Sequence, residues 1–251
     1  VGGDDNTYYH KTPNGSFNKY QLLSDKGLPD QISRIRFING NTYVIGKKRI
    51  EKISKDGQRT SLGFGGNDYF QDDKNYFIAY NYTFKVSKKI GSEARLIHAI
   101  YDSIFINKRT TVFAQDAHKN TWIGTNYGLY LYNASGKTQK WFDVIPELQS
   151  SILDLFYDAE NDFLVIATSS KGLFFIRNNQ ILQHITRRDG LNSITCNSIK
   201  KLNNHYYLIG SNNGINSVLI RKNHFEVKNL NALLGLKNKK INDIEASNNT
   251  I

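Results

Sequence analysis

The chain has 251 residues, of which 39% are hydrophobic, and this is enough for a sizeable core in one large β domain or two ordinary ones. No run approaches the roughly 18 consecutive apolar residues of a membrane span, so any membrane attachment is expected to lie outside this segment. The formal charge is +11, from 33 Lys and Arg against 22 Asp and Glu. This excess favours an anionic partner or a solvated basic surface, because the basic residues are spread along the chain and form no block.

Weak strand signals come first along the chain. Residues 43–46 and 76–79 are short apolar runs that end in Gly46 and Ala79. Each is similar to the second strand of the clearer units that follow. Gly46 and Ala79 are 33 residues apart, whereas Ala79 and Gly124 are 45 apart. The unit between Gly46 and Ala79 is therefore expected to have short loops.

The clearest unit spans residues 111–142. Apolar runs at 111–114, 121–124, 128–132 and 138–142 are separated by polar turns. Four short β-prone runs in this order predict a four-stranded antiparallel meander. Two further units repeat the order, with runs at 152–156, 163–167, 172–176 and 181–185, and then at 197–202, 206–209, 215–219 and 224–227.

A fixed interval relates the second runs of these units. Trp122, Val165 and Leu208 recur at intervals of 43 residues, and one more step reaches Ile251. Four-stranded units of this length are typical of β-propeller blades, whose repeats run at roughly 40–50 residues. One blade has two apolar faces, so its neighbours must cover them. We therefore expect Trp122, Val165 and Leu208 to be core residues between blades, and favour this role for Trp122 over that of a ligand platform.

Other features support an all-β fold. The small residue two positions later in each phrase is expected to allow a neighbouring chain to approach closely, and it is Gly124, Ala167 or Gly210. The best helix pattern, at residues 230–234, is too short for more than one turn. The single cysteine, Cys196, excludes an intrachain disulfide and a cysteine-rich zinc site and is expected to be a small buried residue.

The two ends of the chain bear on the number of blades. Residues 1–3 match 123–125, and residues 249–251 match 120–122. The chain then holds about six blade equivalents, with second-strand positions at Gly2, Gly46, Ala79, Gly124, Ala167 and Gly210. We predict that residues 1–251 form a single β-propeller or a segment of one. Either the N-terminal strands complete the last blade of a closed six-bladed ring, or the segment belongs to a larger propeller.

The repeat unit also resembles the repeat of a known protein family. Residues 116–131, with Trp122-Ile123-Gly124-Thr125 followed by Gly128-Leu129, resemble the two-component regulator propeller repeat. The connectors at 25–29 and 188–193 are similar to its Asp-Gly-Leu-Pro-Ser element. The resemblance implies a periplasmic or otherwise extracytoplasmic sensor region of a bacterial histidine kinase or hybrid two-component system, held in the inner membrane. It also implies a glycan signal and a homodimer of the full protein, with the membrane reached only through other segments.

Motifs for catalysis and metal binding are missing from the sequence. None of the six histidines has the spacing of a helical metal motif, and there is no Gly-x-Ser-x-Gly elbow and no phosphate-binding loop. Paired carboxylates such as Asp72 and Asp73 fall in predicted turns, where Asp is expected for backbone hydrogen bonding. We therefore expect no enzyme activity, metal or cofactor in this segment, and any kinase activity would belong to other regions.

The predicted binding residues lie on the loops between second and third strands and on the connectors between blades. Their basic and amide groups could bind a sulfated or carboxylated sugar through charge-assisted hydrogen bonds, and Tyr127 could add a stacking face. We refer to them as the loop residues: Lys47, Lys48, Asn126, Tyr127, Lys171, Arg187, Arg188, Asn212 and Lys239.

Three functional hypotheses follow from these features. The first is a sensor propeller that binds an oligosaccharide, with an anionic one as a variant. The second is a scaffold that transmits a signal through protein or dimer contacts. The third is a propeller glycan hydrolase or lyase. Nucleic-acid binding would rest on net charge alone and is not expected.

Overall fold

The computed structural model describes residues 7–11, 17–24, 26–62, 65–71, 75–79, 84–90, 93–100, 103–105, 107–222, 224–236 and 239–244. The chain divides into two compact units, Val1–Thr110 and Thr111–Ile251, and each is described by itself. The predictions for Gly2 and for the matching ends, 1–3 and 249–251, lie outside the described residues.

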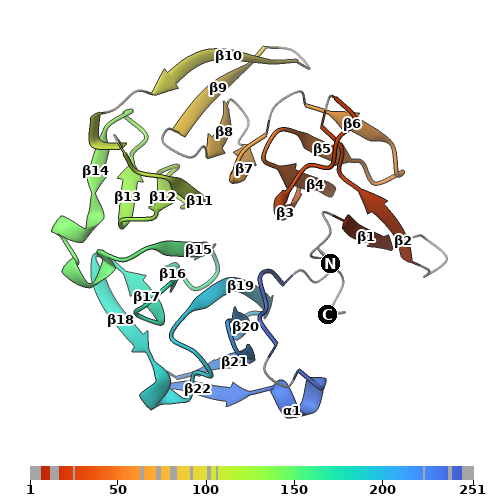
Figure 1. Cartoon of the computed structure of the whole chain (residues 1–251). Helices are drawn as coiled ribbons and strands as arrows, with labels where there is room; N and C mark the ends of the chain where they lie inside the picture. Colours follow the sequence, from red (N-terminus) through yellow and green to blue (C-terminus); the bar gives the residue numbers. More distant parts are fainter. Residues whose placement is uncertain are drawn as a thin grey trace. The chain divides into compact units, whose positions relative to one another are not determined.

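In the first unit, the described residues form two four-stranded antiparallel sheets and one two-stranded sheet (Figure 1). A short 3-10 helix, η1 (Ser103–Phe105), follows the last of its sheets. The two-stranded sheet pairs β1 (Thr7–Lys11) with β2 (Phe17–Gln21). The four-stranded sheets are β3 (Ile32–Ile38), β4 (Asn41–Gly46), β5 (Ile50–Ile53) and β6 (Arg59–Ser61), and then β7 (Asp68–Gln71), β8 (Asn75–Ala79), β9 (Phe84–Ile90) and β10 (Glu93–Ile100).

In the second unit, the described residues form three four-stranded sheets, and each is a meander whose strands follow chain order. The sheets are β11 (Thr110–Gln115), β12 (Thr121–Thr125), β13 (Leu129–Tyr132) and β14 (Thr138–Lys140); β15 (Ile152–Asp158), β16 (Phe163–Thr168), β17 (Leu173–Arg177) and β18 (Gln180–Ile185); and β19 (Cys196–Asn203), β20 (Tyr206–Ser211), β21 (Gly214–Arg221) and β22 (His224–Asn229). The described connectors hold η2 (Trp141–Asp143), η3 (Pro146–Leu148), η4 (Arg187–Asp189) and α1 (Asn231–Leu234).

The predicted second strands are confirmed in both units. The runs at 43–46, 76–79, 121–124, 163–167 and 206–209 lie in β4, β8, β12, β16 and β20, each the second strand of a four-stranded sheet. The only α-helix among the described residues is the four-residue turn α1, as the pattern at 230–234 indicates. No described helix is long and apolar enough to cross a membrane.

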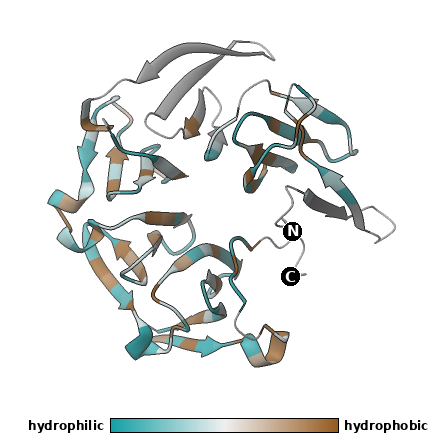
Figure 2. Cartoon of the chain, in the orientation of Figure 1, coloured by the Kyte–Doolittle hydropathy of each residue, from teal (hydrophilic) through white to brown (hydrophobic). Residues whose placement is uncertain are grey.

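The second strands are buried because both faces of their sheets are covered. Every residue of β12 and β16 is buried. Val165 packs in a cluster with Cys196, Tyr207 and Ile209 of the next sheet, so its predicted role between blades is confirmed. The fourth strands β14 and β22 are mainly hydrophilic, in contrast to the apolar inner strands (Figure 2).

The small residue after each second-strand core position is required by close packing. A Cβ atom at Gly124 would lie 2.6 Å from a methyl carbon of Val112 and 2.8 Å from one of Ile152. At Gly210 it would lie 2.4 Å from the Ser198 hydroxyl oxygen. These distances are too short for any side chain, so the predicted close approach is confirmed at both positions.

The Asp-Gly-Leu connector after β18 has a structural reason. Asp189 accepts a hydrogen bond from the backbone N–H of Thr186 at 2.8 Å, and the Thr186 hydroxyl accepts one from the N–H of Arg188 at 3.3 Å. These two hydrogen bonds form a capping box at the N-terminus of η4. Gly190 then takes a φ of 107°, which disfavours any side chain. Leu191 packs into the core cluster of the second unit.

One strand boundary differs from the prediction. The run at 138–142 was expected to be a strand throughout, but β14 ends at Lys140 and Trp141 begins the 3-10 helix η2. Trp141 and Phe142 are buried in this turn. Aromatic residues are typical of strands, which is why the sequence predicts a strand here, but both rings are buried in the turn that follows β14.

Candidate ligand-binding site

The structure places the loop residues where the repeat predicts them. Lys47 and Lys48 lie between β4 and β5 of the first unit. The others belong to the second unit, on the turns after β12, β16 and β20, on η4, and after α1. Within the second unit these turns share one end of the sheets, because antiparallel neighbours reverse direction at each turn.

The contacts of several loop residues are local. The hydroxyl of Tyr127 accepts a hydrogen bond from Gln149 Nε2 at 2.8 Å. Asn212 Oδ1 accepts one from Asn197 Nδ2 at 3.0 Å. In the first unit, Lys47 donates to Asn67 Oδ1. The pKa of Lys47 is lowered, mainly because its ammonium group is partly buried. Whether the loop residues bind a ligand stays a prediction.

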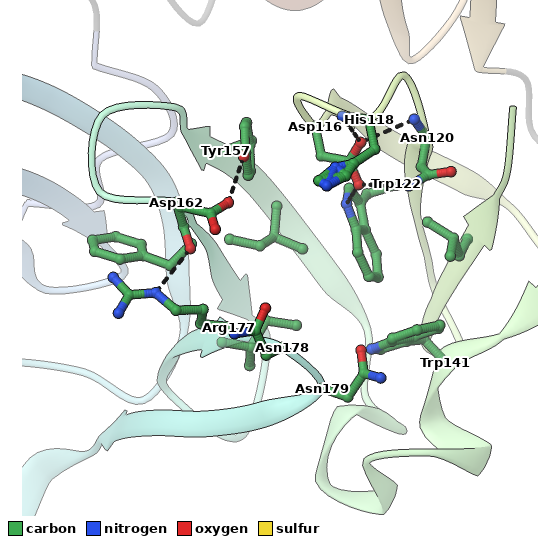
Figure 3. A pocket seen from close by; sticks show the side chains of 14 residues that line it. Asp116, His118, Asn120, Trp122, Trp141, Tyr157, Asp162, Arg177, Asn178 and Asn179 are labelled. Carbon is green, nitrogen blue, oxygen red and sulfur yellow. Dashed lines mark hydrogen bonds between the residues drawn. The ribbon is translucent and has the colours of Figure 1, made fainter.

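A pocket lies at the opposite end of the second unit, between the first two of its sheets (Figure 3). Its volume is about 230 Å³. The turns after β11, β15 and β17 surround it, and none of the loop residues lines it. We refer to it as the tryptophan pocket, and its lining residues are Asp116, His118, Asn120, Trp122, Leu131, Trp141, Tyr157, Asp162, Phe163, Leu164, Ile176, Arg177, Asn178 and Asn179.

The turn after β11 holds Trp122 in place. The carboxylate of Asp116 accepts hydrogen bonds from the backbone N–H groups of His118 and Asn120, both at 2.9 Å. It also accepts from Asn120 Nδ2 at 3.0 Å and from Trp122 Nε1 at 3.2 Å. With four donors bound, Asp116 is a structural acceptor that orients the indole ring. Trp122 is buried as predicted, and it also lines the pocket.

Trp141 meets Trp122 edge to face at one wall of the pocket. Their ring centroids are 4.9 Å apart and the planes are perpendicular, a favoured aromatic geometry. The side chain of Trp141 is only 8% exposed. Its buried Nε1–H has no hydrogen-bond partner among the described residues. Figure 3 shows this nitrogen on the edge of the ring toward Asn179.

The facing wall comes from the second sheet. Tyr157 donates its hydroxyl to Asp162 Oδ1 at 2.7 Å. Arg177 donates from Nε to the backbone oxygen of Asp162 at 3.0 Å and from a second nitrogen to that of Asn161. Burial, followed by the hydrogen bond to Asp162, raises the pKa of Tyr157, so this hydroxyl keeps its proton.

Two asparagine amides stand at the rim. Asn178 and Asn179 form the two-residue turn between β17 and β18, with φ of 48° and 64°. A turn with positive φ at both central residues suits the twist of a hairpin, and Asn tolerates it well. The backbone requirement therefore places two amides, each a donor and an acceptor, beside the pocket.

At the next interface along the chain, an ion pair and a tyrosine occupy the matching place, and a separate pocket lies beside them. Residues lining that pocket are Phe156, Glu160, Lys200, Lys201, Leu202, Asn203 and Asn204. The register pairs Tyr157 with Leu164 in one sheet and Lys201 with Tyr207 in the next. At this second interface Asp158 accepts from Lys201 Nζ at 2.8 Å and from the Tyr207 hydroxyl. Hence Tyr157 and Leu164, which line the pocket, occupy the positions that Lys201 and Tyr207 use to seal the other interface.

Electrostatics strengthen the sealed interface. Burial alone would raise the pKa of Asp158, but hydrogen bonds from Lys201, Tyr207 and Asn161 outweigh burial and lower it. Lys201 also pairs with Glu160 at 2.6 Å. Burial would lower the pKa of Lys201, but its two carboxylate partners raise it. Both groups are thus charged near neutral pH.

Other candidate chemistry is weak within the described residues. No group of three or more His, Cys, Asp or Glu among them could hold a metal ion. Cys196 is buried, as predicted, and burial raises the pKa of its thiol to about 12. A thiol of this kind is inert. The arrangement of the tryptophan pocket favours binding, because its hydrogen-bonding groups surround an aromatic wall.

Sequence reasoning did not find this pocket. It assigned Asp116, Asp158 and Asn178 to turns and gave those turns no function. One signal was available, since Trp122 and Trp141 are the only two tryptophans of the chain and lie in the same repeat unit. The predicted strand at 138–142 placed Trp141 on a sheet edge and hid their convergence.

Comparison with known proteins supports the fold. No family model and no curated protein sequence matches the chain. Solved structures do match, including one described as the extracellular domain of a one-component system, BT4673, from B. thetaiotaomicron. That likeness has 19% identity and a TM-score of 0.58, and it covers 86% of this chain and 32% of the other.

Two further structures extend the comparison. The extracellular domain of a protein described as a hybrid two-component system, BT3049, from B. thetaiotaomicron has 14% identity and a TM-score of 0.55, with 94% of this chain and 40% of the other covered. Virginiamycin B lyase from Staphylococcus aureus has 12% identity and a TM-score of 0.65, with 89% and 77% covered.

These likenesses confirm the predicted fold class, an all-β protein built from β-propeller blades. Two of the structures are extracellular domains of signalling systems, the class of protein that the repeat resembles. The chain spans 32% and 40% of their lengths. At these identities the likeness concerns the fold, and ligands must be argued from the site.

Proposed function

We propose that the chain is part of the ligand-sensing domain of an extracytoplasmic bacterial signalling protein, and that its ligand is an oligosaccharide. The observation that carries the ligand class is the tryptophan pocket. It combines two indole rings, three asparagine amides and two carboxylates in one small cavity. Sugars present C–H faces and hydroxyl groups together, so they match a wall that is both aromatic and hydrogen-bonding.

The signalling role rests on the resemblance of residues 116–131 and on the fold shared with two extracellular domains of signalling systems. Under this proposal the full protein is a periplasmic sensor anchored in the inner membrane. It acts as a homodimer, and a histidine kinase or another output domain lies in regions beyond this chain. The loop residues would form a second glycan-binding surface, at the end of the sheets away from the tryptophan pocket.

The prediction of about six blade equivalents rests on the sequence repeat. Five of the six expected second-strand positions, from Gly46 to Gly210, lie in second strands of four-stranded sheets. The sixth, Gly2, lies outside the described residues. We keep about six blade equivalents as the proposal, with a closed ring and a segment of a larger propeller as its two forms.

A glycan screen tests the ligand class. Thermal unfolding of the whole chain would be measured with neutral and acidic oligosaccharides, and a ligand that binds only the folded state raises the unfolding temperature. The proposal expects at least one saturable stabilisation that Trp122→Ala and Trp141→Ala both weaken. Lys228→Ala is the control, because Lys228 lies on β22 and belongs neither to the pocket lining nor to the loop residues.

The outcomes separate the alternatives. No stabilisation by any glycan would contradict the proposal. Cleavage of a glycan by the isolated chain would favour a hydrolase or lyase. Self-association of the chain without any glycan response would favour a protein-interaction scaffold.

A further inference from the structure

We propose that the tryptophan pocket binds a single neutral sugar unit at the end of a glycan and discriminates against acidic sugars. This inference rests on the proposed oligosaccharide ligand and adds its charge and its mode of entry. It differs from the expectation drawn from net charge, because the loop residues favour a sulfated or carboxylated sugar.

Size limits the occupant to one ring. The pocket has a volume of about 230 Å³, whereas pockets for small molecules usually measure roughly 300–1,000 Å³. Residues from two neighbouring sheets line the space (Figure 3). One terminal unit can enter while the rest of the glycan stays in solvent.

The buried indole N–H of Trp141 determines what the occupant must offer. This donor has no partner among the described residues, and a buried donor without an acceptor carries a desolvation cost. A sugar hydroxyl or ring oxygen can accept from it. An alkylammonium group cannot, because it has donors only. The pocket therefore suits a polyol better than a cation, although aromatic rings alone would accept either.

Asp162 supplies the complementary acceptor. Its Oδ1 already accepts from Tyr157, but a carboxylate has about four lone-pair sites. The side chain is exposed at the mouth of the pocket (Figure 3). Asp116 offers no such capacity, because four donors already bind its carboxylate. A hydroxyl group can thus donate to Asp162 while another accepts from Trp141.

The charge of the lining disfavours an acidic sugar. The lining has two carboxylates and one guanidinium, so its formal charge is −1 with His118 counted as neutral. Two nitrogen atoms of Arg177 already donate to the backbone oxygens of Asp162 and Asn161. A uronate or sulfate would then be repelled by Asp162, and Arg177 could offer it only the one nitrogen that these two bonds leave. The pocket is acidic within a chain whose net charge is +11.

Calorimetric titration of the whole chain tests the inference. The probes are methyl glycosides of neutral hexoses and the matching methyl uronides, together with neutral and acidic oligosaccharides. We expect a neutral glycoside to bind, with an affinity within about tenfold of its oligosaccharide, since one unit makes most of the contacts. The matching uronide should bind at least about tenfold more weakly.

Two variants assign the roles. Trp141→Phe keeps an aromatic ring and removes the N–H, so the affinity for the neutral glycoside should fall about fivefold or more. Asp162→Asn keeps an acceptor and removes the charge, so the uronide should gain at least about threefold while the neutral glycoside changes less. Tyr206→Phe is the control, because Tyr206 lies on β20 and belongs neither to the pocket lining nor to the loop residues. Thermal unfolding checks that each variant is folded.

The failures are distinguishable. Tight binding of acidic glycans with none of neutral ones would overturn this inference and leave the oligosaccharide proposal standing. An unchanged affinity in folded Trp141→Phe would also overturn it. Absence of binding to every glycan tested would overturn both.

Discussion

In the second unit, two interfaces between sheets carry different side chains at the same repeat positions. The sealed interface, between sheets β15–β18 and β19–β22, joins Asp158 to Lys201 and Tyr207. The open interface, between sheets β11–β14 and β15–β18, has Tyr157 and Leu164 at the matching positions and holds the tryptophan pocket. The two interfaces thus differ at two side chains in register, and a separate pocket of about 320 Å³ lies beside Glu160 and Lys201 at the edge of the sealed interface.

The two aspartates show how this difference arises. Both organise the turn after a first strand by accepting backbone N–H groups. Asp158 also binds two donors from the next sheet, whereas Asp116 binds the indole of its own sheet. The repeat thus conserves the turn as a scaffold, and function depends on what neighbouring sheets add to it.

Exchanging the two side chains should have the largest effect. The double variant Tyr157→Lys, Leu164→Tyr gives the open interface the residues of the sealed one, and the new side chains would fill the pocket and reach toward Asp116. We expect glycan affinity to fall at least about a hundredfold, because occupied space and a blocked acceptor both oppose binding. Calorimetry measures the affinity, and circular dichroism verifies the fold. Full affinity in the folded double variant would show that the glycan binds elsewhere.

Removing Asp158 should lower the unfolding free energy more than removing Asp116. Asp158→Ala leaves Lys201 and Tyr207 without their buried acceptor, and we expect a loss of about 3 kcal/mol in unfolding free energy. Asp116→Ala removes a half-buried carboxylate whose donors are all neutral, so it leaves no cation unpaired and should cost less, about 2 kcal/mol. Denaturant unfolding measures both. Equal losses would mean that the ion pair adds nothing to the sealed interface.

The sealed interface should also give the second unit a dependence on acid. The folded state lowers the pKa of Asp158, so its contribution is complete above the ordinary value of about 3.9 and is lost as the pH falls through the lower folded value. Asp158→Asn should therefore flatten unfolding free energy against pH between about pH 5 and pH 2. An unchanged slope in this variant would exclude Asp158 as the source.

The rate at which a thiol reagent labels Cys196 should reveal local opening of the sealed interface. This residue packs in the same cluster as Val165 and Tyr207, and burial raises its pKa to about 12. A thiol reagent at neutral pH should label it only when this core opens. Labelling should be faster in Asp158→Ala than in Asp116→Ala. Rapid labelling of the parent chain would contradict a tightly closed core.

The sequence predicts the scaffold well because the scaffold repeats. Burial in β16 and the close approach at Gly124 follow from apolar runs and small residues that recur at a fixed interval. The pocket could not be predicted in the same way, because it arises where the pattern departs from itself. Leu164 in place of a tyrosine, and Trp141 in a turn after β14, are ordinary apolar residues until their neighbours are known.

Tryptophan fluorescence gives the most direct test that the pocket is the glycan site. The chain has only two tryptophans, and both line the pocket, so emission excited selectively from tryptophan reports on this site alone. Titration with a neutral glycan should produce a saturable change in emission, at the concentrations where calorimetry detects binding. Calorimetric binding that leaves the emission unchanged would contradict the account.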